Sequence, residues 1–215
     1  MTKLYLDWLD NSRRQLWEKL DIFSPYKGVL AGGTAVAMQL GHRISDDFDI
    51  FLPVNIPPAA RQKALTVIEG LDKVPIDDEH QLTLISHSGL KLTLVSYPYL
   101  PLYPLVETDS LPLFRLADLA SNKAYTVGRR GVWRDYIDLY FLLHEKTVSL
   151  EQIINESLKR FGHEFFPKRF LEQLIYTAGL GEMEIDFLRD KIGPNEMVNF
   201  FENEVKIYIK SHLSL

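Results

Sequence analysis

Two aspartates separated by one apolar residue are the first side chains whose spacing could support chemistry. Asp47 and Asp49 flank Phe48 in the stretch "DFDIFL", which alternates polar and apolar residues as a half-buried strand does. Because strand side chains alternate between faces, both aspartates would share one face while the apolar residues enter a core. Close carboxylates repel unless a cation intervenes, and Mg²⁺ binds one or two protein carboxylates together with substrate phosphates. The spacing favours a magnesium site, and an exposed acidic edge strand is the alternative.

A pair of glycines precedes this strand. Gly32 and Gly33 separate an expected short strand, residues 28–31, from an expected helix, residues 34–40. Glycine lets a phosphate approach the main chain, and the following helix offers N–H groups and the Thr34 hydroxyl to an anion. No Gly-Lys-Ser/Thr follows, so the stretch is not a Walker A loop. The pattern predicts a phosphate-binding turn, with an ordinary tight turn as the alternative.

A lysine interrupts an apolar stripe further along the chain. The helix expected over residues 116–127 carries Lys123 on the side that is otherwise apolar. The polar residues predicted to lie on the opposite, solvent-facing side are Asp118, Ser121 and Asn122. A buried ammonium is costly unless it meets an anion, such as a triphosphate or the carboxylate of Asp138. The alternative is a lysine whose stem covers the core while its head reaches water.

The next expected helix, residues 132–145, is apolar on most sides. Its narrow polar strip consists of Arg134, Asp135, Asp138 and Glu145. This strip is either the wall of a functional cleft or a solvent face on which Arg134 and Asp138 pair four residues apart. Nearby, Arg129, Arg130 and Arg134 form a basic cluster that could bind RNA phosphates or simply solvate a loop. The six histidines have no spacing typical of metal ligands.

Strand patterns dominate the first half of the chain and helix patterns the second. A helix is expected over residues 3–20, a strand over 47–52, a helix over 59–71 and a hairpin over 80–99. From residue 116 onward the expected helices are 116–127, 132–145, 150–161, 168–178 and 195–210. The expected fold class is α/β (α+β), with a mixed-sheet core over residues 1–110 and a helical module over 111–215. The proline-containing stretch 101–115 would link them.

Composition narrows the class of protein. The chain has 215 residues, a net charge of -5 and no cysteine. These features argue against extensive wrapping of nucleic acid and exclude disulfides and thiolate metal sites. No apolar run reaches the roughly 20 residues that cross a bilayer, and the N-terminus does not read as a signal peptide. We therefore expect a cytoplasmic protein without a membrane partner.

Two stretches resemble signatures of a known family. "GGTAVAMQLGHRISDDFDIF" resembles the signature of polymerase-beta-like nucleotidyltransferases, in the branch called the AbiEii/AbiGii toxin family. "LADLASNKAYTVGRRGVWRDYIDLYFLL" resembles the second signature of that branch, a lysine on a helix followed by Arg-Asp-x-x-Asp-Leu. The resemblance covers residues 28–145. Members of the family are toxins of type IV toxin–antitoxin or abortive-infection systems.

The resemblance implies a Mg²⁺-dependent enzyme that transfers a nucleoside monophosphate from a nucleoside triphosphate to an acceptor. The acceptor would be RNA, in particular tRNA, and a cognate antitoxin protein would be a partner. The metal would be held by Asp47 and Asp49. The implied nucleotide-binding residues are Gly32, Gly33, Thr34, Arg43 and Ser45. The further catalytic residues would be Lys123, Asp135 and Asp138.

One position departs from the family pattern. Nucleotidyltransferases that act on a hydroxyl usually carry a third carboxylate on a later strand, where this sequence has Thr93 in "LKLTLVSYPY". Threonine cannot act as a base at neutral pH. This departure leaves two hypotheses open: an active nucleotidyltransferase, and a catalytically silent nucleotidyltransferase fold that binds a nucleotide or a partner.

Overall fold

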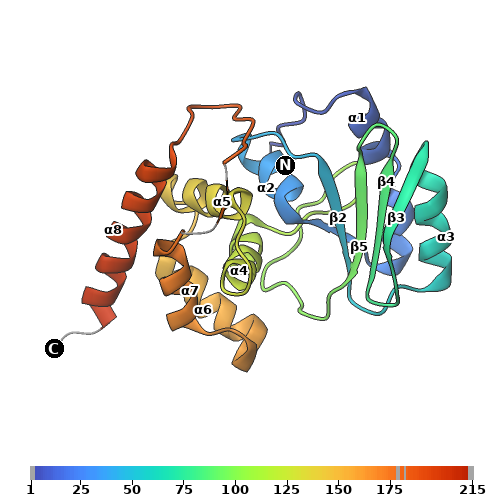
Figure 1. The fold of residues 1–215 in the computed structure, drawn as a ribbon. Coiled ribbons are helices and arrows are strands. Elements are labelled where there is room, and N and C mark those ends of the chain that lie inside the picture. The colour runs from blue at the N-terminus through green and yellow to red at the C-terminus, as the bar shows by residue number, and fades with distance from the viewer. Residues whose placement is uncertain (1–2, 178–179, 182, 213–215) are drawn as a thin grey trace. The chain divides into compact units, whose positions relative to one another are not determined.

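The computed structural model describes residues 3–177, 180–181 and 183–212, and it divides into two compact units (Figure 1). The first unit comprises residues 1–40 and 44–115, and the second comprises residues 41–43 and 116–215. Residues 41–43 therefore belong with the C-terminal helices, although they follow directly after a helix of the first unit. The second unit thus includes His42 and Arg43, which come from the N-terminal part of the chain.

A mixed five-stranded sheet forms the centre of the first unit. The strand order is β1-β2-β5-β4-β3, and only the β2–β5 pair is parallel. The strands are β1 (Val29–Ala31), β2 (Asp47–Leu52), β3 (Leu71–Asp77), β4 (Gln81–Ser86) and β5 (Lys91–Ser96). The expected mixed α/β fold is confirmed, and β2 begins and ends where the alternating pattern predicts.

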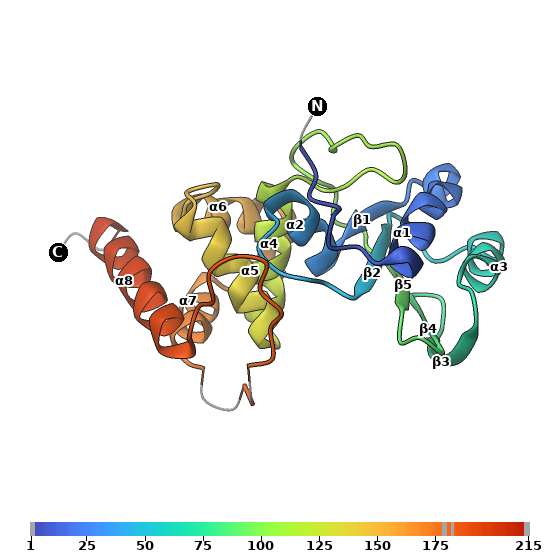
Figure 2. The ribbon, with the colours of Figure 1, turned by 90° about the horizontal axis from the view of Figure 1, so that it is seen from above.

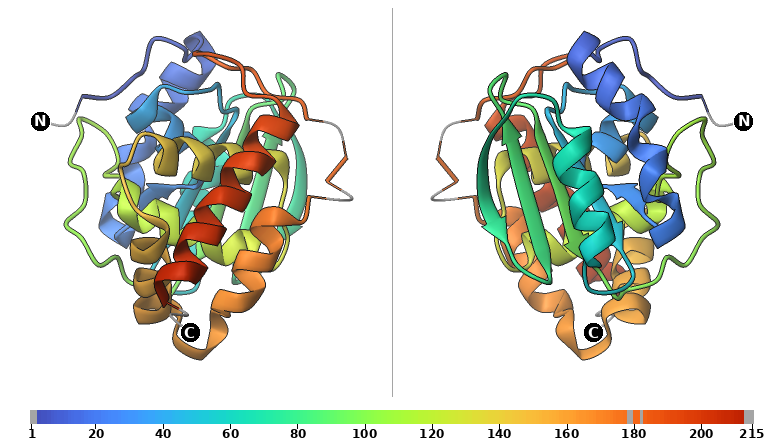
Figure 3. Two further views of the ribbon diagram at one scale, coloured as in Figure 1. Left: turned by 90° about the vertical axis from the view of Figure 1, so that its left-hand side faces the viewer. Right: turned by 90° about the vertical axis from the view of Figure 1, so that its right-hand side faces the viewer.

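The two faces of β2 differ in chemistry. Phe48, Ile50 and Leu52 are fully buried, whereas Asp47 and Asp49 on the alternate positions remain partly exposed. Two helices cover the apolar face of the sheet, α3 (Pro58–Val67) and the 3₁₀ helix η1 (Leu20–Tyr26), as the right-hand view of Figure 3 shows. The alternation therefore places both aspartates on the face turned away from α3 and η1.

The sequence pattern did not reveal β3, since the expected helix ended at residue 71 and the expected hairpin began only at residue 80. This strand pairs only with β4, its register shifts twice, and six of its seven residues are exposed. It also contains Pro75 and charged side chains, which are the usual protection of an edge strand against further pairing. A strand without a buried face has no apolar alternation to detect.

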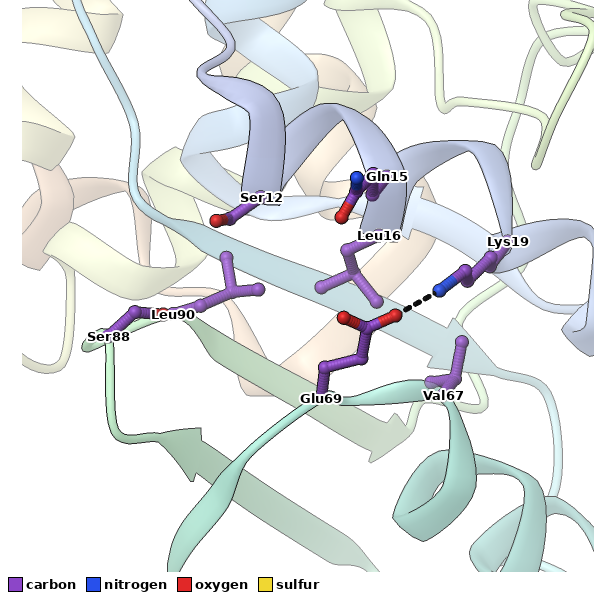
Figure 4. A pocket seen from close by; sticks show the side chains of 8 residues that line it. All are labelled: Ser12, Gln15, Leu16, Lys19, Val67, Glu69, Ser88 and Leu90. Atoms are coloured by element: carbon purple, nitrogen blue, oxygen red, sulfur yellow. Dashed lines mark hydrogen bonds and ion pairs between the residues drawn. The ribbon is translucent and has the colours of Figure 1, made fainter.

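The N-terminal helix is shorter than expected. Helix α1 spans Asn11–Glu18 rather than residues 3–20, because the Asp10 side chain accepts a hydrogen bond from the backbone N–H of Arg13 and caps its first turn. Beside α1 lies a small pocket of about 60 Å³, lined by α1, the end of α3 and the β4–β5 turn (Figure 4). The ion pair between Lys19 and Glu69, 2.5 Å long, lies at this pocket.

The second unit is helical. Helix α4 (Leu116–Val127) packs against α5 (Trp133–His144) and α6 (Leu150–Phe161), and α7 (Pro167–Ile175) packs against α8 (Pro194–His212) (Figure 2). A short 3₁₀ turn, η2 (Gly162–Glu164), follows α6. Each helix lies within three residues of its expected bounds. The Ser149 side chain caps α6 by accepting a hydrogen bond from the backbone N–H of Gln152. Among the described residues, no helix is long and apolar enough to cross a membrane.

Candidate active site

The glycine turn brings the start of a helix against one of the two aspartates. Helix α2 (Gly32–Leu40) begins directly after β1, and Gly32 has a positive φ of 66°. A Cβ at this position would lie 2.1 Å from Oδ2 of Asp49. Glycine is therefore required twice, for its backbone angle and for the close approach of a carboxylate. The carboxylate of Asp49 thus lies at the positive end of the α2 dipole.

Hydroxyl groups join the first turn of α2 to the start of β2. Thr34 is fully buried, and its hydroxyl is hydrogen-bonded to the Ser45 hydroxyl at 2.9 Å and to the backbone carbonyl of Asp47. These bonds fix the glycine turn relative to the strand that carries the aspartates. Contact of either hydroxyl with a nucleotide stays a prediction.

A lysine from the neighbouring strand contacts Asp47. In the parallel pairing of β2 with β5, Asp47 is opposite Lys91 and Asp49 is opposite Thr93. The Lys91 ammonium lies 3.0 Å from Oδ2 of Asp47, and both side chains are partly exposed. The carboxylate of Asp47 therefore already binds one cationic group.

The donor atoms of this face fit a hard divalent cation. Asp47 and Asp49 supply carboxylate oxygens from one face of one strand, which suits Mg²⁺ when substrate phosphates complete its coordination. Among the described residues, no group of three or more acidic or histidine side chains is arranged to hold a metal by itself. Water molecules or the oxygen atoms of a bound substrate would have to complete the coordination of a metal here.

Thr93 occupies the position next to Asp49 on β5. Its side chain is 3% exposed, and its hydroxyl has no hydrogen-bond partner among the residues that the structure describes. The register therefore places Thr93 directly beside Asp49 on the neighbouring strand. A neutral side chain at this position leaves two carboxylates on the acidic face of β2.

A buried cluster of charges lies within the second unit, centred on Asp138 of α5. The Asp138 carboxylate accepts hydrogen bonds from His42 Nε2 at 2.8 Å and from Arg43 Nε at 2.7 Å. The Lys123 ammonium lies 2.6 Å from the other carboxylate oxygen of Asp138 and 2.8 Å from Asp135. Lys123 therefore meets acidic partners, as its place on an apolar stripe predicts. The same cluster anchors the 41–43 segment to α5.

Burial and charge act against each other in the pKa values of this cluster. Burial disfavours the charged forms, but Arg43 and Lys123 outweigh it and hold the pKa of Asp138 well below its usual range. Asp135 and Asp138 likewise outweigh burial and raise the pKa of Lys123. For His42 burial prevails and lowers the pKa, so its imidazole is neutral at pH 7. The cluster consequently contains two cations and two anions.

The prediction of a solvent-facing side on α4 was wrong. Asp118 and Ser121 are fully buried and Asn122 is 9% exposed, because Arg160 of α6 inserts its guanidinium against them. Nη1 of Arg160 donates to the Asp118 backbone carbonyl at 2.8 Å, the Ser121 hydroxyl at 2.6 Å and the Asn122 side-chain oxygen at 2.7 Å. Arg160 lies on a strongly amphipathic helix, and only its place beside the apolar Ile153 and Ile154 could have indicated burial.

The polar strip of α5 divides into a buried acidic pair and exposed residues that include Arg134. Asp135 and Asp138 are buried while Arg134 is exposed, and the carboxylate of Asp138 is occupied by the groups described above rather than by Arg134. The sequence also gave no reason to single out His42, because its partner lies ninety-six residues away along the chain. Only the contact between the 41–43 segment and α5 identifies it.

The candidate residues therefore fall into two groups. The first unit brings together Gly32, Gly33, Thr34, Ser45, Asp47 and Asp49. The second unit brings together Arg43, Lys123, Asp135 and Asp138. Arg43, expected among the nucleotide-binding residues, is 2% exposed and bound to Asp138.

Comparison with known sequences adds a relative but assigns no family. No family model matches the chain. An uncharacterized protein of Aquifex aeolicus is 29% identical over 191 residues, which cover 85% of this chain and 88% of that protein. Its description gives no activity, so it adds a relative without adding a function.

Solved structures give a closer indication of fold. The nucleotidyltransferase toxin MenT4 of Mycobacterium tuberculosis is similar with a TM-score of 0.60 and 16% identity, covering 91% of this chain and 82% of that chain. JHP933 of Helicobacter pylori is similar with a TM-score of 0.54 and 15% identity, covering 95% and 94% of the two chains. The similarity to MenT4 shows a nucleotidyltransferase fold.

Proposed function

We propose that this protein is a magnesium-dependent nucleotidyltransferase that transfers a nucleoside monophosphate from a nucleoside triphosphate to an acceptor. The observation that carries the proposal is the contact between the glycine turn and the acidic strand, where Asp49 lies against Gly32 at the start of α2. The glycine turn would bind the phosphates and β2 would bind the metal of the same triphosphate.

The proposed reaction is a displacement at the α-phosphorus. An acceptor oxygen forms a bond to that phosphorus, the bond to the bridging oxygen breaks, and pyrophosphate leaves while the acceptor loses its proton to solvent. Asp47 and Asp49 would hold Mg²⁺, which supplies charge neutralisation at the phosphates. Gly32, Gly33 and Thr34 would orient the triphosphate, and the fixed backbone of their turn requires no reorganisation during the reaction.

Lys123 is proposed to steady the charge that develops on the leaving pyrophosphate. The family resemblance supports this role, together with the acidic pair of Asp135 and Asp138. In the structure these two carboxylates hold the ammonium in a defined position and raise its pKa, so the group is cationic at neutral pH. A fixed cation is suited to stabilising a developing negative charge.

The proposed acceptor is RNA, in particular tRNA, and the proposed biological role is that of a toxin held in check by an antitoxin. The similarity to a nucleotidyltransferase toxin supports this extension. A pocket in the second unit adds support, since Arg129 stacks on Tyr125 at 3.6 Å and Arg169 and the exposed Phe166 line the same pocket. Glu164 also lines this pocket and lies 3.4 Å from Arg129, so Arg169 is the cation there that could meet a phosphate directly. Arginine and aromatic side chains together suit phosphates and unstacked bases.

Incorporation of labelled nucleotide into RNA tests the proposed activity. Wild-type protein, incubated with Mg²⁺, RNA and each of the four α-labelled triphosphates in turn, is expected to label RNA with at least one of them. Asp49→Ala is expected to abolish the label. If no triphosphate gives a label above that of Asp49→Ala, the catalytic proposal is rejected.

The second candidate function is a silent nucleotidyltransferase fold that binds nucleotide or a partner without turnover. The neutral Thr93 beside Asp49, whose hydroxyl meets no hydrogen-bond partner in the described part of the chain, favours this candidate. Calorimetry with Mg²⁺ and each triphosphate, combined with the transfer assay, separates the two. Binding that depends on Asp47 and Asp49 without any transfer would support the silent fold.

A further inference from the structure

Lys91 lies where a cation would compete for Asp47. Its ammonium is 3.0 Å from Oδ2 of Asp47, and the two residues are direct neighbours in the parallel β2–β5 pairing. Two positions along β5 on the same face lies Thr93, opposite Asp49. This acidic face of β2 and β5 therefore contains two carboxylates and one ammonium, where a third carboxylate is replaced by a hydroxyl.

Charge determines how such a face binds a free metal ion. Two carboxylates alone would attract a divalent cation, but the ammonium lowers the negative charge by one and occupies an oxygen that the metal needs. A triphosphate reverses this balance, because its phosphate oxygens bind the metal and also offer an alternative partner to the lysine. Lys91 is 37% exposed, so its head can move without unfolding the sheet.

We propose that Lys91 is a nucleotide-binding residue that exchanges partners. Without nucleotide it is bound to Asp47 and weakens the binding of free metal, and with nucleotide it transfers to the triphosphate and leaves Asp47 to the metal. The site then takes metal and triphosphate together rather than metal first. This inference rests on the proposed function, since it assumes that Asp47 is a metal ligand.

Lys91→Met should change two binding affinities in opposite directions. Mn²⁺ alone, followed by the electron paramagnetic resonance signal of the free ion, should bind the variant about fivefold more tightly, because a competing surface ion pair worth up to about 1 kcal/mol is lost. Magnesium tripolyphosphate, followed by calorimetry, should bind it roughly tenfold more weakly, because one charge-assisted hydrogen bond to phosphate is lost. Neither probe depends on the identity of the nucleobase.

The matched control is Lys73→Met on the edge strand β3. Lys73 also lies beside an acid, 3.7 Å from Asp72, and its removal changes the net charge of the protein equally. Both binding constants should stay within twofold of the wild type in this variant. Lys91→Gln provides a second, more polar variant with the same expected pattern if Lys91→Met does not fold.

Asp47→Asn separates failure of this inference from failure of the proposed function. If Asp47→Asn weakens Mn²⁺ binding while Lys91→Met changes neither constant, or changes both in the same direction, the exchange by Lys91 is overturned and the metal site stands. If Asp47→Asn leaves Mn²⁺ binding unchanged, the metal is not held at Asp47 and both proposals are overturned. Tighter Mn²⁺ binding together with weaker tripolyphosphate binding confirms the exchange.

Discussion

At the scale of single residues, two positions connect the fold to the proposed chemistry most tightly. Gly32 has a positive φ and accommodates the carboxylate of Asp49 where any other residue would place a Cβ. Asp138 is fully buried, and its carboxylate binds the side chains of His42, Arg43 and Lys123. Both positions have a matched control elsewhere in the chain, so their contributions can be measured separately.

Gly32→Ala should disrupt the site more than its backbone angle alone explains. The control is Gly70→Ala, because Gly70 has a similar φ of 63° but its added Cβ would meet no atom closer than 3.8 Å. Backbone strain should cost each variant about 1–2 kcal/mol of unfolding free energy. In Gly32→Ala the new methyl group should also displace Asp49, so only this variant should lose affinity for magnesium–triphosphate. Equal triphosphate affinity in the two variants would show that the contact with Asp49 is irrelevant to binding.

Asp138→Ala should lower the free energy of unfolding by about 3–5 kcal/mol, because the buried Arg43 and Lys123 lose their shared partner. Lys123→Met should also destabilise the folded protein, because the buried Asp135 and Asp138 lose the ammonium that pairs with both. The loss of unfolding free energy in the double variant should be about 1–3 kcal/mol smaller than the sum of the losses in the two single variants, since the residues interact directly. Urea unfolding measures the stability of all three variants.

The control is Arg189→Ala, which breaks a partly exposed ion pair with Glu145 and should cost less than about 1 kcal/mol of unfolding free energy. Additive losses would contradict a direct interaction.

At the scale of elements, sequence periodicity predicted the helices and strands that bury a regular apolar face, and it missed a strand that does not. Strand β2 and helices α4 and α6 match their expected bounds, because each presents a regular apolar pattern to a core. Strand β3 was missed because nearly all of it is exposed. The pattern of α4 identified Lys123 but placed Asp118 on the wrong side, since a partner from a distant helix can bury a polar face.

Arg160 should therefore be important for packing between α4 and α6. Arg160→Met should cost about 2–4 kcal/mol of unfolding free energy, because buried acceptors on α4 lose their donor. The neighbouring exposed Lys159→Met on the same helix is the control and should change stability by less than about 0.5 kcal/mol. Thermal and urea unfolding of both variants provide the comparison. Similar stabilities would mean that the buried network contributes nothing.

The contact of the 41–43 segment with α5 should make the folded state sensitive to acid. Burial lowers the pKa of His42 from 6.5, so below that pH the unfolded chain takes up a proton that the folded chain resists. Stability should consequently fall as the pH decreases from 6.5, by up to about 1.4 kcal/mol per pH unit. The lowered pKa of Asp138 adds a further loss below its usual value of 3.8, where the unfolded carboxyl is protonated first. His42→Gln should flatten the dependence between about pH 7 and pH 5. A wild-type stability that is constant over that range would refute the burial of a neutral histidine.

At the scale of the whole molecule, the sequence predicted the mixed α/β fold class. It could not predict that residues 41–43 join the helical unit, because this depends on contacts of His42 and Arg43 with a helix that begins ninety residues later. The side chain that contacts Asp47 was also missed, since the pairing of β2 with β5 is a long-range parallel contact. Local periodicity carries no information about such pairings.

The central claim is that the acidic face of β2 supports nucleotidyl transfer. The direct measurement compares transfer of label to RNA from α-labelled and from γ-labelled triphosphate by wild type, Asp49→Asn and Asp46→Asn. Asp46 is the matched control, because it is an adjacent acid bound to Arg13, 2.5 Å away. We predict that wild type and Asp46→Asn transfer the α-label and not the γ-label, and that Asp49→Asn loses at least about a hundredfold in rate. Transfer of the γ-label, or equal α-label transfer by Asp49→Asn and wild type, would contradict the account.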